Sequence, residues 1–249
     1  MTMLQLVGIL NVTPDSFSDG GQFFDPDRAI KQAKKLFTDG ASIVDVGAES
    51  TKPSAIPLTT DEEWKRLEPL LDILIPLYPN KISVDSYHPE NIKRAFNIGP
   101  IIVNDVTGMN NPDMVRVVSE LKPIVIISHL PGADIQEAHR LTPVSTIEQV
   151  KQDLLAKAKL LEDSGLKRDQ IILDPGIGFG KTMKLNQELL DFPKQVPEFK
   201  VMIGYSRKRF LGDDRMDLTP NLNAGKIAAT SGAAFLRVHD VLGHRDLIK

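Results

Sequence analysis

The sequence predicts an α/β protein that forms a (β/α)8 barrel, in a single domain spanning residues 1–249. Short runs rich in β-branched residues alternate with helical patterns about eight times, as in a chain of β-then-α units. These runs are almost continuously apolar, which is typical of parallel strands covered on both faces. A doubly wound open sheet is the alternative architecture that the same pattern allows.

Eight segments have the strand pattern, and helical spacing follows each of them. The strands are expected at 4–11, 41–47, 81–86, 100–105, 123–129, 170–176, 200–206 and 234–240. The helices are expected to begin at Pro26, Thr60, His88, Pro112, Ser145, Met183 or Lys184, Asn223 and Asp240.

Two of the helices have particularly clear signals. The stretch "TTDEEW" offers a threonine cap followed by acidic residues in the first turn, which is a good helix start. In the helix expected from Ser145, the apolar residues follow the spacing of one helix face; they are Val150, Leu154, Leu155, Ala158 and Leu161.

Composition excludes several classes of protein. Hydrophobic content of 41% and charged content of 25% are ordinary for a globular protein, and a formal net charge of -3 argues against general nucleic-acid binding. The absence of cysteine excludes disulfides, thiolate metal sites and a cysteine nucleophile. No apolar run is long enough to cross a membrane. We therefore expect a soluble protein, with a cytoplasmic location that fits the lack of cysteine.

Polar residues stand at the carboxyl end of every expected strand. They are Asn11, Gly47 with Glu49 and Thr51, Asp85, Asn104 with Asp105, Ser128 with His129, Asp174, Ser206 with Lys208, and Arg237 with His239. Any single one could be a strand-ending turn residue. The whole set contains amides, carboxylates and cations, and in a barrel all of them meet at one mouth, where the catalytic residues of this fold lie.

Three of these residues are suited to binding a flat heterocycle. Asp174 follows the apolar run "IILD", so its carboxylate needs a partner, either a planar pair of N–H donors or a neighbouring lysine or arginine. Asn104 and Asp85 end two strands that face the same mouth. Because an amide both donates and accepts hydrogen bonds, the three together fit a guanine-like or pterin-like ring.

Cations gather at the last two strand ends. Arg207 and Lys208 follow the seventh strand, while Arg237 and His239 leave the eighth strand at a spacing of two, so they point the same way. This pattern indicates a substrate with an anionic end, phosphate above all. No histidine pair has the spacing of a transition-metal site. Any metal is expected to be Mg²⁺ that arrives with the phosphate.

Seven motifs, in this order, resemble those of the dihydropteroate synthase family of pterin-binding TIM barrels. They are "GILNVTPDSFSDGG", "DVGAESTKP", "ISVDS", "VNDV", "DPGIGFGK", "GYSRK" and "RVHDV", and they extend from Gly8 to about Val241. The resemblance implies a homodimer that joins p-aminobenzoate to 6-hydroxymethyl-7,8-dihydropterin diphosphate, with Mg²⁺, and releases diphosphate. It also implies a lid at "NVTPDSFSDGG" that closes over the site.

The resemblance assigns roles residue by residue. Pterin would be held by Asp85, Asn104, Asp174 and Lys208. Diphosphate would be bound by Asn11, Thr51, Arg237 and His239, with Asn11 also touching the metal. The p-aminobenzoate pocket would be shaped by Phe17, Pro53, Phe179 and Ser206. The catalytic set would be Asp174, Lys208, Arg237 and His239.

Some positions depart from the family pattern. Lys52 stands where arginine is usual, Ile177 where an aromatic residue is frequent, and "SHLPG" where a methionine-rich stretch is common. Two alternatives therefore stay open. One is a pterin-binding methyltransferase domain, which would not need the cations at the last two strands, and the other is a non-catalytic paralogue that binds a pterin without turnover.

Overall fold

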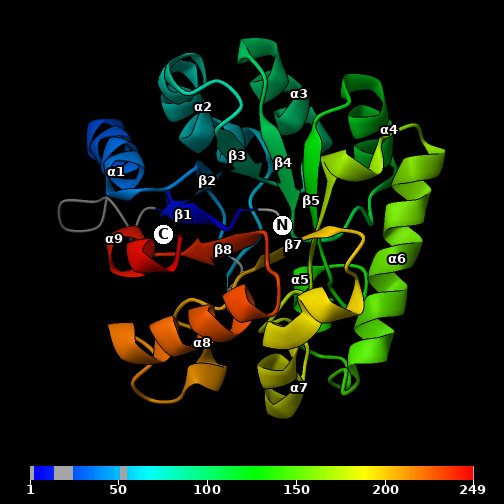
Figure 1. Cartoon of the computed structure of the whole chain (residues 1–249). Coiled ribbons are helices and arrows are strands. Elements are labelled where there is room, and N and C mark those ends of the chain that lie inside the picture. Colours follow the sequence, from blue (N-terminus) through cyan, green and yellow to red (C-terminus); the bar gives the residue numbers. More distant parts are fainter. Residues whose placement is uncertain (1–2, 14–24, 51–54, 249) are drawn as a thin grey trace.

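The computed structural model describes residues 3–13, 25–50 and 55–248 of the chain, and these form a closed parallel barrel with strands in the order of the sequence. Each strand pairs with the next, and β8 pairs with β1, in register Val7 to Arg237 and Gly8 to Val238. Figure 1 shows the helices arranged around the ring of strands. The (β/α)8 prediction is confirmed, and the open sheet is excluded by the closure.

The strands are short and follow the predicted segments closely. They are β1 (Gln5–Asn11), β2 (Ile43–Gly47), β3 (Ile82–Asp85), β4 (Ile102–Asp105), β5 (Ile124–Ser128), β6 (Ile171–Asp174), β7 (Lys200–Ile203) and β8 (Phe235–Val238). The α-helices are α1 (Pro26–Asp39), α2 (Thr60–Leu77), α3 (Pro89–Ile98), α4 (Pro112–Leu121), α5 (Ile135–Ala138), α6 (Ile147–Asp163), α7 (Met183–Glu188), α8 (Leu218–Thr230) and α9 (Val241–His244). The 3-10 turns are η1 (Arg168–Gln170), η2 (Leu189–Gln195), η3 (Arg209–Leu211) and η4 (Arg245–Ile248).

Several helices begin at a different residue from the predicted one. Helix α8 begins at Leu218, five residues before the predicted Asn223, because Pro220 falls in its first turn, where a missing N–H removes no helical hydrogen bond. Helix α6 begins after Thr146, whose side chain accepts from the backbone of Gln149. His88 and Asp240 are cap residues rather than first helical residues.

The predicted signals at α2 and α6 are confirmed. Thr59 caps α2 in a capping box with Glu62. Along α6, Val150, Leu154, Ala158 and Leu161 are buried, while Leu155 is partly buried against the same core. This core lies between the strands and the surrounding helices, and it contains the outward-facing residues of the strands. None of the helices within the described ranges is both long and apolar enough to cross a membrane.

The inside of the barrel has an apolar layer below and a polar layer above. The apolar layer is a separate cluster formed by Val7, Ile43, Ile102, Ile126, Ile172, Met202, Ala234 and Phe235. Side chains two residues apart on a strand face the same way. The residues that follow at this spacing are Ile9, Asp45, Asn104, Ser128, Asp174, Gly204 and Arg237. The strands therefore carry the polar layer on top of an apolar floor.

Candidate active site

A cavity of about 440 Å³ opens at the carboxyl ends of the strands. All eight strands or the loops that follow them supply lining residues. These are Ile9, Asn11, Thr13, Glu49, Ser50, Asp85, Asn104, Val106, Ser128, Asp174, Phe179, Gly204, Ser206, Lys208, Arg237 and His239. The predicted polar mouth is thus a single cavity, which is large enough for a bicyclic ring.

Arg237 stands at the centre of a buried network of charges. Its Nε donates to Asp45 Oδ2 at 2.6 Å, and its Nη2 donates to Asp85 Oδ2 at 2.9 Å. Asn104 Nδ2 lies 3.2 and 3.1 Å from the two oxygens of Asp45. One guanidinium therefore joins two carboxylates from β2 and β3, and within the described residues its other N–H groups are available to an anion.

Asp45 is the site residue that the strand-end analysis missed. It lies two residues before the end of β2, and it is only 1% exposed. A signal was present, because a lone carboxylate between two valines in an apolar strand requires a buried partner. That partner, Arg237, is 192 residues away in the sequence, so no local pattern connects the two.

The amide of Asn104 has one unused atom. Its Nδ2 is taken by Asp45, while its Oδ1 is buried and has no hydrogen-bond partner in the described part of the chain. Because Asn104 lines the cavity, this oxygen is an acceptor available to an N–H group of a bound ring.

Asp174 and Lys208 face each other across the next part of the cavity. Asp174 Oδ1 accepts from the backbone of Gly176 at 2.7 Å, and Lys208 Nζ donates to the carbonyl of Ile177 and lies 5.1 Å from the centre of the Phe179 ring. A Cβ added at Gly204 would lie 3.5 Å from Asp174 Oδ2 and 3.9 Å from Lys208 Nζ. Gly204 thus keeps open the space beside both groups.

The charged groups of the cavity are perturbed by burial. The pKa of Asp85 is raised to about 7, first by burial and then by the Asp45 carboxylate, against the opposing effect of Arg237. Burial also raises the pKa of Asp174, while Lys208 opposes that shift. Burial lowers the pKa of Lys208 to about 8, with Asp174 working against it, so Lys208 is still mainly charged at pH 7. Burial removes water from the carboxylates and the lysine. A polar ligand that hydrogen-bonds to them would replace the interactions lost with that water.

His239 is neutral rather than cationic. Its pKa is lowered to about 3 by burial and by the nearby Arg207 and Arg237. Its Nδ1 lies 3.0 Å from Ser206 Oγ. The structure therefore corrects the grouping of His239 with the cations: it contributes a neutral imidazole, and the positive charge comes from Lys208 and Arg237.

The structure brings together most of the predicted site residues. The cavity lining includes eleven of them in the described ranges: Asn11, Glu49, Asp85, Asn104, Ser128, Asp174, Phe179, Ser206, Lys208, Arg237 and His239. Phe17, Thr51, Pro53 and most of the predicted lid lie outside the described residues, as does Lys52. Ile177 is fully buried in the main core and is absent from the lining, so this departure from the family does not alter the cavity wall.

The predicted Mg²⁺ would have Asn11 as a protein ligand at the mouth. Asn11 is exposed at the end of β1 and lines the cavity, so its amide oxygen is available. Mg²⁺ is usually held by one or two protein oxygens together with substrate phosphates. A single amide oxygen beside the cations fits a metal that enters with its phosphate ligand.

His129, which could have lined the cavity, is instead a structural residue. It is 3% exposed, and its Nε2 lies 3.0 Å from Asp153 Oδ2 on α6. The backbone carbonyl of His129 accepts from Lys181 Nζ, which also donates to the carbonyls of Gly176 and Phe179. These contacts hold the loop that carries Phe179.

A barrel whose mouth collects carboxylates, an amide and two cations around one cavity defines an enzyme that binds a small polar ring with an anionic group. The model of the pterin-binding enzymes matches residues 7–239, so the chain belongs to that family. Within the family its similarity is to dihydropteroate synthases. The enzyme of Haemophilus influenzae is 34% identical over 260 residues, covering 100% of this chain and 93% of that protein.

Solved structures agree with the sequence comparison. A Xanthomonas albilineans dihydropteroate synthase with 4-aminobenzoic acid has a TM-score of 0.88 at 32% identity, covering 99% of this chain and 91% of that one. A Yersinia pestis dihydropteroate synthase in a sulfonamide complex has a TM-score of 0.89 at 28% identity, with 99% and 92% covered. The resemblance stated from the motifs is confirmed.

Proposed function

We propose that the chain condenses 6-hydroxymethyl-7,8-dihydropterin diphosphate with p-aminobenzoate to give 7,8-dihydropteroate and diphosphate. The observation that carries this proposal is that one cavity holds both kinds of binding group. Asp174 and the free oxygen of Asn104 line it, and they suit a ring with amine and N–H groups. Arg237 and His239 line the same cavity, and they suit diphosphate.

The chemistry needs little from the protein beyond binding and charge stabilisation. An arylamine is already neutral and nucleophilic at pH 7, so no strong general base is required. The C–O bond to diphosphate breaks, the C–N bond to the arylamine forms, and the nitrogen loses a proton. The difficult step is the departure of diphosphate from the pterin methylene carbon. Groups that bind diphosphate more tightly as its charge develops lower this barrier.

The described residues have matching roles in this step. Arg237 keeps N–H groups free for diphosphate, and the neutral His239 donates a further hydrogen bond. Asn11 would hold Mg²⁺, which when bound offsets the charge of the leaving group. Asp174 favours positive charge on the pterin ring as the bond breaks. Lys208, beside Asp174, would hold the ring in place together with the Phe179 face.

The alternatives fit less well. A methyltransferase domain would use a pterin site but would have no need of Arg237 and His239 beside it. A non-catalytic paralogue would keep ring binding without turnover. The cavity holds both the ring-binding and the anion-binding residues, and this supports the synthase. The homodimer, the cytoplasmic location, the Mg²⁺ requirement and the assignment of Thr51, Phe17 and Pro53 stay predictions.

The test is diphosphate release by the purified protein mixed with pterin diphosphate, Mg²⁺ and p-aminobenzoate. Asp174→Asn and Lys208→Ala should abolish release, whereas Asp163→Asn, the same chemical change on the exposed face of α6, should not. A sulfonamide should compete with p-aminobenzoate. Pterin binding without release by the unmodified protein would refute the synthase and favour the non-catalytic paralogue.

A further inference from the structure

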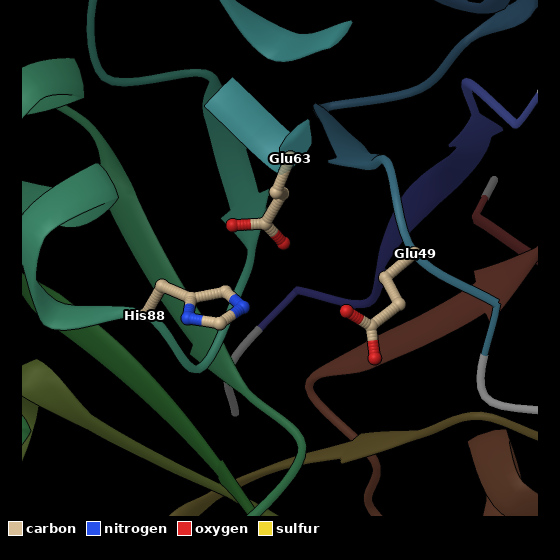
Figure 2. A group of neighbouring side chains, drawn as sticks. All are labelled: Glu49, Glu63 and His88. Carbon is tan, nitrogen blue, oxygen red and sulfur yellow. The ribbon is translucent and has the colours of Figure 1, made fainter. Parts of the chain in front are cut away.

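We propose that Glu49, Glu63 and His88 form a binding site for one divalent transition-metal cation, with Zn²⁺ as its expected occupant. One oxygen from each glutamate and one imidazole nitrogen lie within 4.8 Å of one another. Figure 2 shows the carboxylate of Glu63 above the His88 ring, with the Glu49 side chain reaching in from the opposite side. The proposal does not depend on the pterin chemistry.

Two buried atoms in this cluster lack partners. Glu63 is 0% exposed, and its Oε1 has no hydrogen-bond partner in the described part of the chain. The same holds for His88 Nε2, which is also buried. An unpaired buried carboxylate oxygen and an unpaired imidazole nitrogen are costly in a folded protein. A cation between them would satisfy both.

The remaining polar atoms of Glu63 and His88 have hydrogen-bond partners of the kind that orient metal ligands. Glu63 Oε2 accepts from Ser86 Oγ at 2.6 Å and from Asn91 Nδ2 at 2.8 Å. His88 Nδ1 lies 3.2 Å from Thr60 Oγ1. If Thr60 accepts this hydrogen bond, the proton sits on Nδ1, and Nε2 presents its lone pair to the cluster. Partners of this kind fix the tautomer and orientation of a metal-bound histidine.

Glu49 completes the set from the side of the cavity. Its Oε1 accepts from the hydroxyl of Tyr87 at 2.6 Å and its Oε2 from the backbone of Leu58 at 2.9 Å. Each carboxylate oxygen has two lone-pair positions, so these hydrogen bonds leave room for a metal. Glu49 lines the mouth cavity, whereas Glu63 and His88 are not among the described lining residues, so the cation would lie at the edge of the substrate site.

The donor set favours a transition metal over Mg²⁺. Imidazole is a preferred ligand of Zn²⁺ and its neighbours, while Mg²⁺ is bound mainly by oxygen. Ligand atoms about 2.0–2.2 Å from a four-coordinate Zn²⁺ are separated by roughly 3–4 Å, within the spread of this cluster. Two carboxylates also balance the charge of a divalent cation. The spacing of histidines along the sequence could not reveal the site, because its ligands come from two successive β/α units and include only one histidine.

The experiment measures Zn²⁺ binding to the chelator-treated full chain by calorimetry, with metal content after dialysis as a second readout. The unmodified protein should bind one Zn²⁺ per chain. His88→Ala and Glu49→Gln change partly exposed side chains and should lose this binding. Thr60→Val, which removes only the partner of His88, should weaken it about 10–100-fold. Circular dichroism of each metal-free variant establishes that it is folded.

His139→Ala is the matched control. His139 is also partly buried, and its Nε2 has no partner among the described residues, but it is not part of the Glu49–Glu63–His88 cluster. This variant should bind Zn²⁺ as the unmodified protein does, and Co²⁺ bound to both should show the absorption of a low-symmetry site. Absence of stoichiometric Zn²⁺ in the folded unmodified protein would overturn the proposal. Equal Zn²⁺ binding by the His88→Ala variant would also overturn it.

Discussion

The charge network around Arg237 predicts how Asp45→Asn will change the acid limb of the pH profile of kcat/KM, the part in which kcat/KM rises with pH. The pKa of Asp85 is about 7, and the Asp45 carboxylate is the second largest cause of its rise after burial. If ionised Asp85 is the form that binds pterin diphosphate, kcat/KM should rise with pH through about 7. Removing the charge of Asp45 should move this limb to lower pH.

The size of the shift follows from the geometry. Asp45 and Asp85 bind Nε and Nη2 of the same guanidinium, at 2.6 and 2.9 Å. Their bound oxygens are then roughly 5 Å apart, and two unit charges at that distance repel by about 3 kcal/mol at an effective dielectric constant of about 20. This corresponds to about 2 pKa units. Because the amide keeps some dipolar interaction, we expect a shift of about 1–2 units.

The assay is the pH dependence of kcat/KM for pterin diphosphate, with the Asp85 carboxyl followed by carbon NMR as a second readout. The amide should preserve the fold, since its oxygen can still accept from Arg237. Asp153→Asn, a carboxylate-to-amide change beside His129, serves as the control and should leave the limb in place. An acid limb that stays at the same pH in Asp45→Asn, or moves upward, would refute the electrostatic reasoning.

Three further predictions follow from single contacts. Gly204→Ala places a methyl group at ordinary contact distance from Asp174 Oδ2, so the protein should still fold. The methyl group takes space beside Asp174, so the pterin affinity measured by calorimetry should drop about tenfold, which is ~1.4 kcal/mol. His239→Gln should keep more activity than His239→Ala, because a neutral donor suffices; the alanine variant should lose about 1.5–3 kcal/mol of transition-state binding, measured as kcat/KM. Lys181→Met removes a hydrogen-bond donor from the carbonyls of His129, Gly176 and Phe179 and should lower the free energy of unfolding in urea by about 2–3 kcal/mol. Equal kinetics of the two His239 variants, or an unchanged urea midpoint, would contradict the last two.

Stability should also depend on pH through His239. Its pKa in the folded protein, about 3, is below the ordinary value of 6.5, so the unfolded chain binds more protons between these two values. The folded protein should therefore lose stability as pH falls from about 6.5 toward 3. Urea unfolding at several pH values should show a smaller acid loss in His239→Gln than in the unmodified protein. An equal loss in both proteins would indicate that other groups dominate.

The sequence allowed the barrel and most of its mouth to be predicted because both depend on local patterns. Continuous apolar runs located the strands. Because side chains alternate along a strand, residues such as Asp174 and Arg237 could be placed in one cavity. Contacts between residues that are far apart in the sequence could not be predicted from local patterns. Asp45 was overlooked because its partner is on β8, and the neutral state of His239 depends on burial and on cations that follow β7 or lie on β8. The start of α8 was missed because Pro220 is compatible with a first turn.

The layered interior of the barrel limits insertions and deletions within the strands. Five strands (β2, β4, β5, β6 and β8) carry an apolar floor residue and a residue of the polar layer at a fixed spacing of two, as in Ile172 and Asp174. Loss or gain of one codon within a strand would exchange the inner and outer faces beyond that point. A charged group would then meet the helix-side core while an apolar one entered the cavity. The strands can therefore diverge by substitution but not by changes in length.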